Sequence, residues 1–159
     1  MYTPSISPVD PNLLLLNCDM SGVYRSADGG QNWEMIHYRQ LTSSTRVRPV
    51  WHPVEASVAF AAGGWGGPLK MTRDQGRTWS VVQGGPSAVS AIGIDPGRPE
   101  LMLVGGRREI YRSTDGGKNW TETATVRGRL LGFHFDQTSP AEKRTCFAAS
   151  DQTIFRSDD

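Results

Sequence analysis

A short turn motif recurs along the chain at nearly even intervals, and this repeat constrains the fold more than any other feature. Three segments align without gaps on the pattern Ser/Thr-x-Asp-x-Gly-x-Thr/Asn-Trp. The shared residues are Ser26, Asp28, Gly30 and Trp33, then Thr72, Asp74, Gly76 and Trp79, then Ser113, Asp115, Gly117 and Trp120. A fourth copy begins at Ile154 and reaches its aspartate at Asp159. The four aspartates are 46, 41 and 44 residues apart, which is the length of one four-stranded β-propeller blade.

The motif has the chemistry of a closed turn between two strands. It follows an apolar strand-like run, and its tryptophan opens another. Glycine tolerates the positive φ angles of tight turns, and an aspartate can accept backbone N–H bonds inside such a turn. The indole can cover the turn and pack between neighbouring blades. We therefore interpret Asp28, Asp74 and Asp115 as structural residues and not as catalytic ones.

A proline-containing turn precedes each box. It is expected to join the first two strands of the blade, as the box joins the last two. These turns lie at 7–12, 52–55 and 95–99, and each is followed by an apolar run that fits a buried strand. The sequence therefore predicts an all-β fold, a β-propeller of four-stranded antiparallel blades. The expected domain is a single partial propeller over 1–159, with about four blades near 1–38, 45–83, 87–125 and 129–159, the last one incomplete. Because strand and box patterns run up to both ends, we expect a fragment of a propeller with seven or more blades.

Charge and composition argue against several classes of partner. The chain has 17 Lys and Arg against 16 Asp and Glu, a formal net charge of +1, which gives no reason to expect binding to nucleic acid. No apolar run approaches the ~18 residues of a membrane helix, so no membrane insertion is expected. The leucine run 13–16 is strand-sized, so no signal peptide is expected in this chain, and an export signal would lie upstream.

No metal or cofactor site is expected. His37, His52 and His134 lack the spacing of metal ligands, and no nucleophile triad can be assembled from them. The glycine pairs at 84–85 and 105–106 lack the lysine and the following helix of a phosphate-binding loop.

Blade topology predicts a polar face opposite the boxes. Prolines and boxes occupy alternate turns, so the remaining loops emerge at the other end of the strands. Asp19 lies there, as does Trp65, which sits in a glycine-rich segment and could stack on a sugar ring or seal the next blade. The arginines expected on this face are Arg46, Arg48, Arg107, Arg108, Arg127 and Arg129.

These arginines predict a surface that binds carboxylates. The candidate ligand-binding residues are Trp65, Arg46, Arg48, Arg107 and Arg108. The expected partners are a polysaccharide or other glycan, or an acidic protein segment, besides the remaining blades of the propeller. The alternative is that the arginines form surface ion pairs with Glu109, Asp136 or Asp151.

The boxes resemble those of the BNR or Asp-box β-propellers. These include sialidases, the xyloglucanases of glycoside hydrolase family 74, the sortilin (VPS10) receptors and photosystem II assembly factors. The resemblance covers essentially the whole chain, and it implies the fold without choosing among these functions. The segment from Cys18 to Arg25 looks most like the opening of a family 74 enzyme, with Ser21 in place of a glycine. That resemblance implies a catalytic carboxylate at Asp19, with the second carboxylate outside this chain.

Two functions follow from these observations. The leading expectation is a segment of an extracellular or periplasmic protein that binds or hydrolyses glycans and is catalytically incomplete by itself. The alternative is a non-catalytic, protein-binding propeller of the sortilin or photosystem-assembly type. The residues alone do not decide whether the protein is an enzyme.

Overall fold

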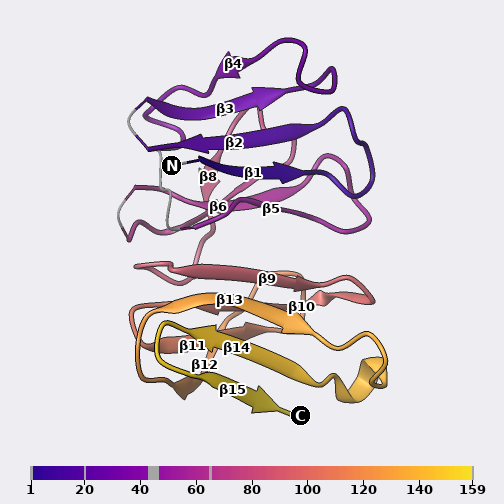
Figure 1. Cartoon of the computed structure of the whole chain (residues 1–159), viewed down its shortest axis with the longest axis vertical. Helices are drawn as coiled ribbons and strands as arrows, with labels where there is room; N and C mark the ends of the chain where they lie inside the picture. The colour runs from indigo at the N-terminus through magenta and orange to yellow at the C-terminus, as the bar shows by residue number, and fades with distance from the viewer. Residues whose placement is uncertain (1, 20, 43–46, 65, 159) are drawn as a thin grey trace.

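Four antiparallel sheets follow one another along the chain in the computed structural model, which describes residues 2–19, 21–42, 47–64 and 66–158 (Figure 1). The first sheet contains β1 (Tyr2–Ile6), β2 (Leu14–Cys18), β3 (Gly22–Ser26) and β4 (Glu34–Met35). The second contains β5 (Val50–Trp51), β6 (Ala59–Ala62), β7 (Leu69–Thr72) and β8 (Ser80–Val81). The third contains β9 (Ala91–Asp95), β10 (Arg98–Gly105), β11 (Glu109–Ser113) and β12 (Thr121–Thr125).

The fourth sheet has three strands among the described residues. These are β13 (Leu130–Phe135), β14 (Cys146–Ser150) and β15 (Ile154–Ser157), with the short 3-10 helix η1 (Ala141–Lys143) between β13 and β14. Every sheet pairs its strands in sequence order, as a propeller blade does. The structure confirms the predicted all-β class and the antiparallel blades. Across the described residues, no helix is long and apolar enough to be a candidate membrane span.

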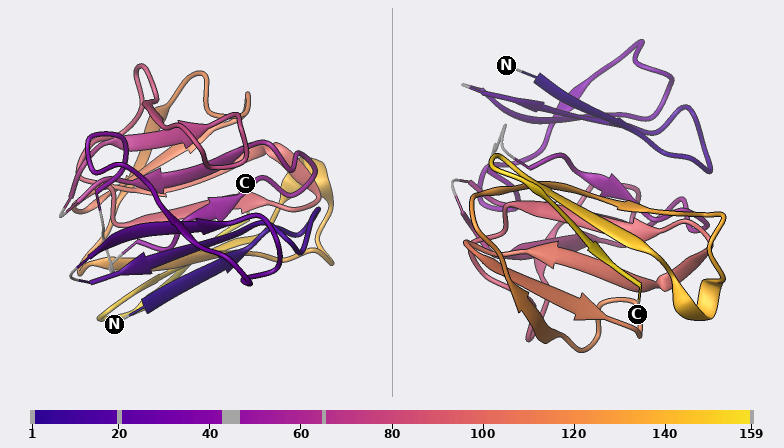
Figure 2. Two further views of the ribbon diagram at one scale, coloured as in Figure 1. Left: turned by 90° about the horizontal axis from the view of Figure 1, so that it is seen from above. Right: turned by 60° about the horizontal axis from the view of Figure 1, so that its bottom comes forward.

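The blades stack in chain order (Figure 2). An apolar layer fills each space between neighbours. Alternation along the second strand of each blade explains this packing, because successive side chains point to opposite faces of a sheet. Leu13 and Leu15 of the first blade pack toward the second, for example, where Ala59 and Ala61 meet them. In the two middle blades, β6 and residues 101–105 of β10 bury side chains on both faces, whereas β2 and β14 alternate between buried and half-buried side chains.

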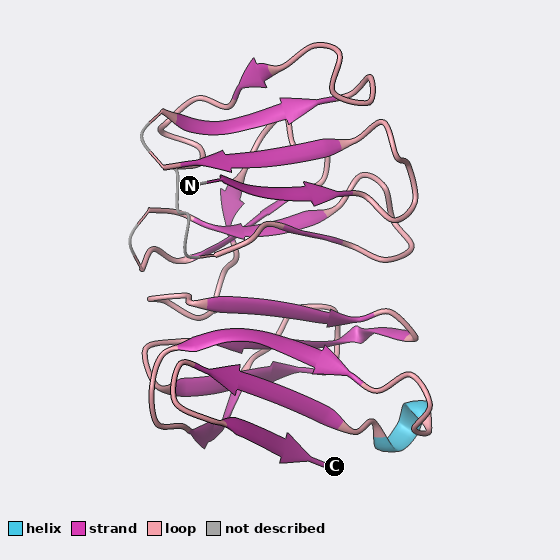
Figure 3. Ribbon diagram, in the orientation of Figure 1, coloured by secondary structure: helices cyan, strands magenta, loops and turns pink. Residues whose placement is uncertain are grey.

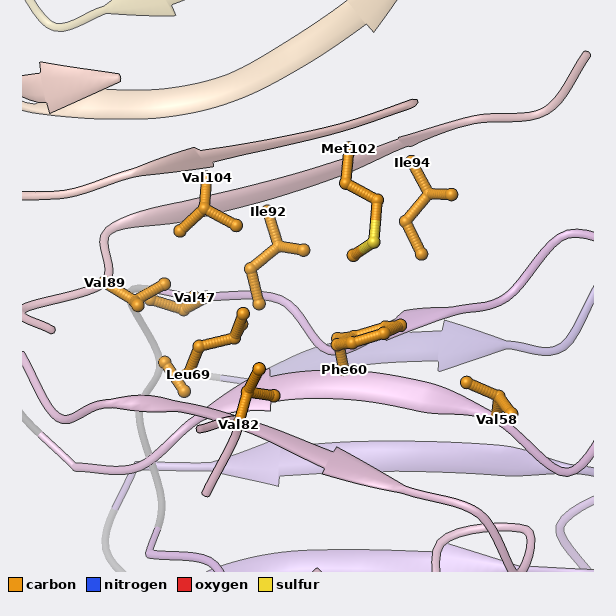
Figure 4. Packing of buried hydrophobic residues seen from close by; sticks show 11 residues of the cluster. Val47, Val58, Phe60, Leu69, Val82, Val89, Ile92, Ile94, Met102 and Val104 are labelled. Atoms are coloured by element: carbon orange, nitrogen blue, oxygen red, sulfur yellow. The ribbon is translucent and has the colours of Figure 1, made fainter. Parts of the chain in front are cut away.

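The layer between the second and third blades shows this packing most completely (Figure 4). Phe60 and Leu69 of the second blade point toward Met102 and Val104 of the third, and all four side chains are fully buried. Burying a side chain of this size contributes about 1.5–3 kcal/mol relative to leaving it in water. The contacts between blades, and not those within a single sheet, therefore supply most of the apolar core.

Turns gather at two opposite ends of the strands (Figure 3). The proline-containing turns and the Asp boxes lie at one end, because they join β1 to β2, β3 to β4 and the equivalent pairs. The β2–β3, β6–β7, β10–β11 and β14–β15 turns lie at the other end, together with the links between blades. The sorting of loops inferred from the repeat therefore agrees with the strand topology.

Candidate functional site

The first Asp box closes its turn with side-chain hydrogen bonds. The Ser26 hydroxyl donates to the Asp28 carboxylate at 2.8 Å and accepts the N–H of Gly30 at 2.9 Å. The same carboxylate accepts the backbone N–H of Asn32 at 2.9 Å. The indole N–H of Trp33 donates to the carbonyl of Gly30 at 2.9 Å. The Ser26 hydroxyl, the Asp28 carboxylate and the Trp33 indole N–H thus all have partners inside the turn.

The other two complete boxes repeat these bonds. Thr72 and Ser113 take the place of Ser26, and their hydroxyls accept the N–H groups of Gly76 and Gly117. Asp74 accepts from Thr78, and Asp115 accepts from Asn119. Trp79 and Trp120 donate to the carbonyls of Gly76 and Gly117 at 3.0 Å. The aspartates hold the turns, which is the role that the repeat suggested for them.

The same bonds hold the box carboxylates in the charged form. Backbone and side-chain N–H donors of Asn32 lower the pKa of Asp28 to about 2, and those of Asn119 do the same for Asp115. Burial would raise the pKa of Asp74, but the hydrogen bonds from Thr78 and Thr72 outweigh it, and this pKa is also lowered. A carboxylate that accepts several N–H bonds is stabilised as the anion.

These pKa shifts predict a loss of stability in acid. The pKa values of Asp28 and Asp115 lie near 2 in the folded protein and at 3.8 without the contacts of the fold. The two carboxylates therefore stabilise the folded state fully above pH 3.8, and this stabilisation is lost as the pH falls toward 2. We expect the urea midpoint to fall between about pH 5 and about pH 2, and to fall less steeply in a variant with Asp28→Asn and Asp115→Asn. Equal slopes for the two proteins would contradict this role of the carboxylates.

The opposite end of the strands carries the candidate functional residues. Asp19 is exposed in the turn between β2 and β3, and Arg48 is exposed in the link that leads into β5. Arg46 and Trp65 lie outside the described residues. The structure therefore places Asp19 and Arg48 on the predicted face.

Four arginines on this face line one shallow cavity of about 580 Å³. We call this cavity the arginine groove and define it by Arg107, Arg108, Arg127, Arg129 and Gln152. The first two arginines come from the β10–β11 turn, the next two from the link between β12 and β13, and the glutamine from the β14–β15 turn. The groove therefore spans the third and fourth blades, and all four arginines are exposed to solvent.

Short backbone contacts fix the loops of the arginine groove. The N–H of Val126 donates to the carbonyl of Arg108 at 2.7 Å. Asp151 accepts the N–H of Arg129 at 2.9 Å and donates its own N–H to the carbonyl of Arg129 at 3.1 Å. Gly128 has a φ of +82°, and a Cβ at this position would collide with the Asp151 carboxylate. The loop thus requires glycine here.

The carboxylates beside the groove have backbone partners. Glu109 accepts the N–H of Arg108 at 3.1 Å, and backbone N–H groups of Arg108 and Glu109 lower the pKa of Glu109. Ion pairs among the described residues join Arg25 to Glu34, Arg144 to Asp95 and Arg156 to Asp158. None of these pairs includes an arginine of the groove, although the charge of Arg107 is one cause of the lowered pKa of Glu109.

Such a groove can bind anions. Guanidinium groups recognise carboxylates through paired, charge-assisted N–H bonds. The groove also contains Gln152, for which the sequence analysis predicted no functional role. The position of Gln152 in the repeat could have indicated it, because the β14–β15 turn is equivalent to the β10–β11 turn that carries Arg107 and Arg108. Nowhere in the described chain do three or more His, Cys, Asp or Glu side chains group as metal ligands.

Comparison with known protein sequences finds the same repeat. The model of the BNR/Asp-box repeat family matches residues 24–35 and 111–122, which hold the first and third boxes. The vacuolar protein sorting/targeting protein 10 of Neosartorya fischeri is 32% identical over 79 residues, and the match covers 46% of this chain and 5% of that protein. The chain therefore matches a small part of this much longer relative.

Solved structures share the arrangement of blades. An ancestral GH74 enzyme superposes with a TM-score of 0.77 at 17% identity, over 97% of this chain and 22% of that chain. YCF48 bound to D1 peptide superposes with a TM-score of 0.56 at 15% identity, over 99% of this chain and 58% of that chain. At these identities the likeness concerns the fold alone. The chain therefore contains BNR/Asp-box repeats, and its stacked antiparallel sheets have the fold of a β-propeller.

Proposed function

We propose that this propeller is a binding module whose arginine groove holds an acidic polypeptide segment. The observation that carries the proposal is the gathering of Arg107, Arg108, Arg127 and Arg129 around one cavity without an ion pair to any described carboxylate. Four arginines on neighbouring loops outnumber the carboxylates of Glu109 and Asp151 beside them, so this end of the strands carries a local positive potential although the net charge of the chain is only +1.

The shape of the groove favours an extended ligand. It runs across loops of two blades and is open to solvent, so side-chain carboxylates of an extended peptide could reach several guanidinium groups in turn. YCF48, which has a similar fold, has been solved with D1 peptide bound. The sequence relative is a vacuolar protein sorting/targeting protein. Both comparisons support a peptide-binding role over a purely structural one.

The test is the binding of an oligoglutamate peptide to the wild type and to a variant with Arg107→Gln and Arg129→Gln. We expect the variant to bind about tenfold more weakly, because an exposed charge pair contributes about 0.5–1 kcal/mol and 1.4 kcal/mol is tenfold in affinity. Titration calorimetry gives the dissociation constants. Because exposed charges are screened, we also expect the wild-type affinity to fall as salt is raised.

A matched control removes the same charge from the opposite end of the blades. Arg73 and Arg77 are exposed in the second Asp box, so a variant with Arg73→Gln and Arg77→Gln should bind the peptide as the wild type does. Equal losses of affinity in the two variants would show that the peptide is attracted by the overall charge of the protein, and would contradict binding at the arginine groove. Binding of oligogalacturonate but not of oligoglutamate would replace the acidic peptide by a carboxylated glycan.

Glycan hydrolysis is a second candidate function. It is supported by the similarity of fold to an ancestral GH74 enzyme and by the exposed position of Asp19 on the same face as the groove. A glycosidase of this kind needs two carboxylates, one acid and one base or nucleophile. Release of reducing ends from xyloglucan by the longest natural protein that contains this chain, abolished by Asp19→Asn, would support hydrolysis. No release would reject Asp19 as its catalytic carboxylate.

An extracellular, periplasmic or secretory-pathway location is part of this proposal. It is supported by the relationship to a vacuolar sorting protein and by the fold shared with a GH74 enzyme. Fractionation of the native host with an antibody to the chain would test it. Recovery in the cytosolic fraction alone would contradict it.

A further inference from the structure

The two loops that carry the arginines of the groove share one arrangement of glycine and carboxylate. In the β10–β11 turn, Glu109 accepts the N–H of Arg108 at 3.1 Å, and the N–H of Gly106 donates to the carbonyl of Glu109 at 2.8 Å. A Cβ on Gly106 would lie 2.8 Å from the Glu109 carboxylate, which is closer than side-chain atoms approach one another. The carboxylate therefore folds back over its own turn and occupies the space that the glycine leaves.

The link between β12 and β13 repeats this arrangement with a carboxylate from another turn. Asp151, in the β14–β15 turn, accepts the N–H of Arg129 at 2.9 Å and donates its own N–H to the carbonyl of Arg129 at 3.1 Å. A Cβ on Gly128 would collide with the Asp151 carboxylate. In both loops, an acidic side chain thus binds the backbone N–H of an arginine of the groove.

These contacts hold the backbone of the arginines and leave their side chains at the cavity. The ion pairs among the described residues include neither Glu109 nor Asp151. Arg108 and Arg129 are exposed and line the groove. Ordering a loop on binding costs affinity. An acidic ligand therefore meets loops that are already in place.

A neutral side chain makes a similar contact in the third blade. The hydroxyl of Ser90, in the link that leads into β9, donates to the carbonyl of Gly106 at 2.8 Å, and the N–H of Ser90 donates to the carbonyl of Gly105 at 2.7 Å. A link between blades can thus be held to the turn of the blade that follows without a carboxylate. The fold does not require a charge at Asp151, and an uncharged acceptor there should preserve the contact.

We propose that Glu109 and Asp151 are positioning residues of the arginine groove, which hold Arg108 and Arg129 by the backbone so that both side chains line the cavity. This role rests on the proposed function of the groove. By charge alone the two carboxylates would repel an acidic ligand. Their removal should therefore weaken binding only when the acceptor of the backbone N–H is removed with the charge.

Two double variants of equal net charge separate position from charge. Glu109→Gln with Asp151→Asn keeps side-chain carbonyls that can accept both N–H groups, whereas Glu109→Ala with Asp151→Ala keeps none. Titration calorimetry with oligoglutamate at one salt concentration measures both. We expect the amide variant to bind about two- to threefold more tightly than the wild type, because two repelling charges are lost. The alanine variant should bind about tenfold more weakly than the amide variant, because its loops must be ordered on binding.

Hydrogen exchange of the free protein measures the positioning without a ligand. The amides of Arg108 and Arg129 should exchange about tenfold faster in the alanine variant than in the wild type or the amide variant, while the amides of the Asp boxes keep their rates. Near-ultraviolet circular dichroism checks that each variant is folded.

The outcomes distinguish this role from the function of the groove. If the wild type binds oligoglutamate but the amide and alanine variants bind it equally well, or exchange at equal rates, the positioning role is overturned and the function of the groove stands. If the wild type does not bind oligoglutamate, the proposed function is rejected and the positioning role with it.

Discussion

Replacement of Arg144 by methionine is expected to lower the free energy of unfolding by about 3–5 kcal/mol, because it leaves a buried carboxylate without its charged partner. Arg144 Nε lies 2.7 Å from Asp95 Oδ2, and the two side chains are only 4% and 0% exposed. Burial would raise the pKa of Asp95, but hydrogen bonds from Gln137, Arg144 and Gly97 outweigh it, and the pKa is lowered. The bonds from Arg144 and Gln137 tie the proline turn of the third blade to the fourth.

The control for Arg144→Met is a pair on the surface. Arg156 and Asp158 are 2.8 Å apart with side chains 62% and 54% exposed, so Arg156→Met should cost less than about 1 kcal/mol. Urea unfolding followed by tryptophan fluorescence measures both variants. Similar losses in the two variants would show that the buried pair does not hold the third and fourth blades together.

Trp79→Ala is expected to destabilise the protein by about 3–5 kcal/mol, as large-to-small changes of core aromatic residues do. Trp79 is 7% exposed and lies in the apolar layer that joins the first and second blades. Its removal leaves a void against Leu15 and Val23, where the surrounding β-strands can move only partly to fill it. The free energy of unfolding in urea measures the loss.

Trp33 provides a matched control within the same motif. It makes the same indole bond to a box glycine, but it is 41% exposed, because no described blade covers it. Trp33→Ala should therefore cost about 1 kcal/mol or less. If Trp33→Ala and Trp79→Ala were equally destabilising, the tryptophan would act within its own turn, and sealing of the neighbouring blade would be excluded as its main role.

The sequence could predict the fold because the information is local and repeated. Each Asp box contains its own donors and acceptors within a few residues, so Asp28 and Asn32 find each other without help from the rest of the chain. The even spacing of the boxes then predicted blades, and the apolar runs predicted which strands are buried. Antiparallel pairing also placed the arginines at one end of the strands.

Contacts between blades could not be predicted from the sequence. Arg144 and Asp95 are 49 residues apart, and Arg25 and Gln75 are 50 apart, so no local pattern pairs them. The same limit applies to the arginine groove. Topology placed Arg48 and Arg107 at one end of the strands, but only the packing of the third and fourth blades brings Arg107, Arg129 and Gln152 to one cavity. The positions of the groove residues also depend on the conformation of their loops, which contacts such as that of Gly128 with Asp151 determine.

We propose that the face opposite the Asp boxes is a binding surface for acidic segments. The most direct measurement is a titration of the ¹⁵N-labelled protein with oligoglutamate, followed residue by residue through the amide resonances. We expect saturable shifts at residues 106–109, 127–129 and 152, with the box turns unchanged. Shifts spread over both ends of the blades, or no shift at the arginine groove, would contradict this binding role.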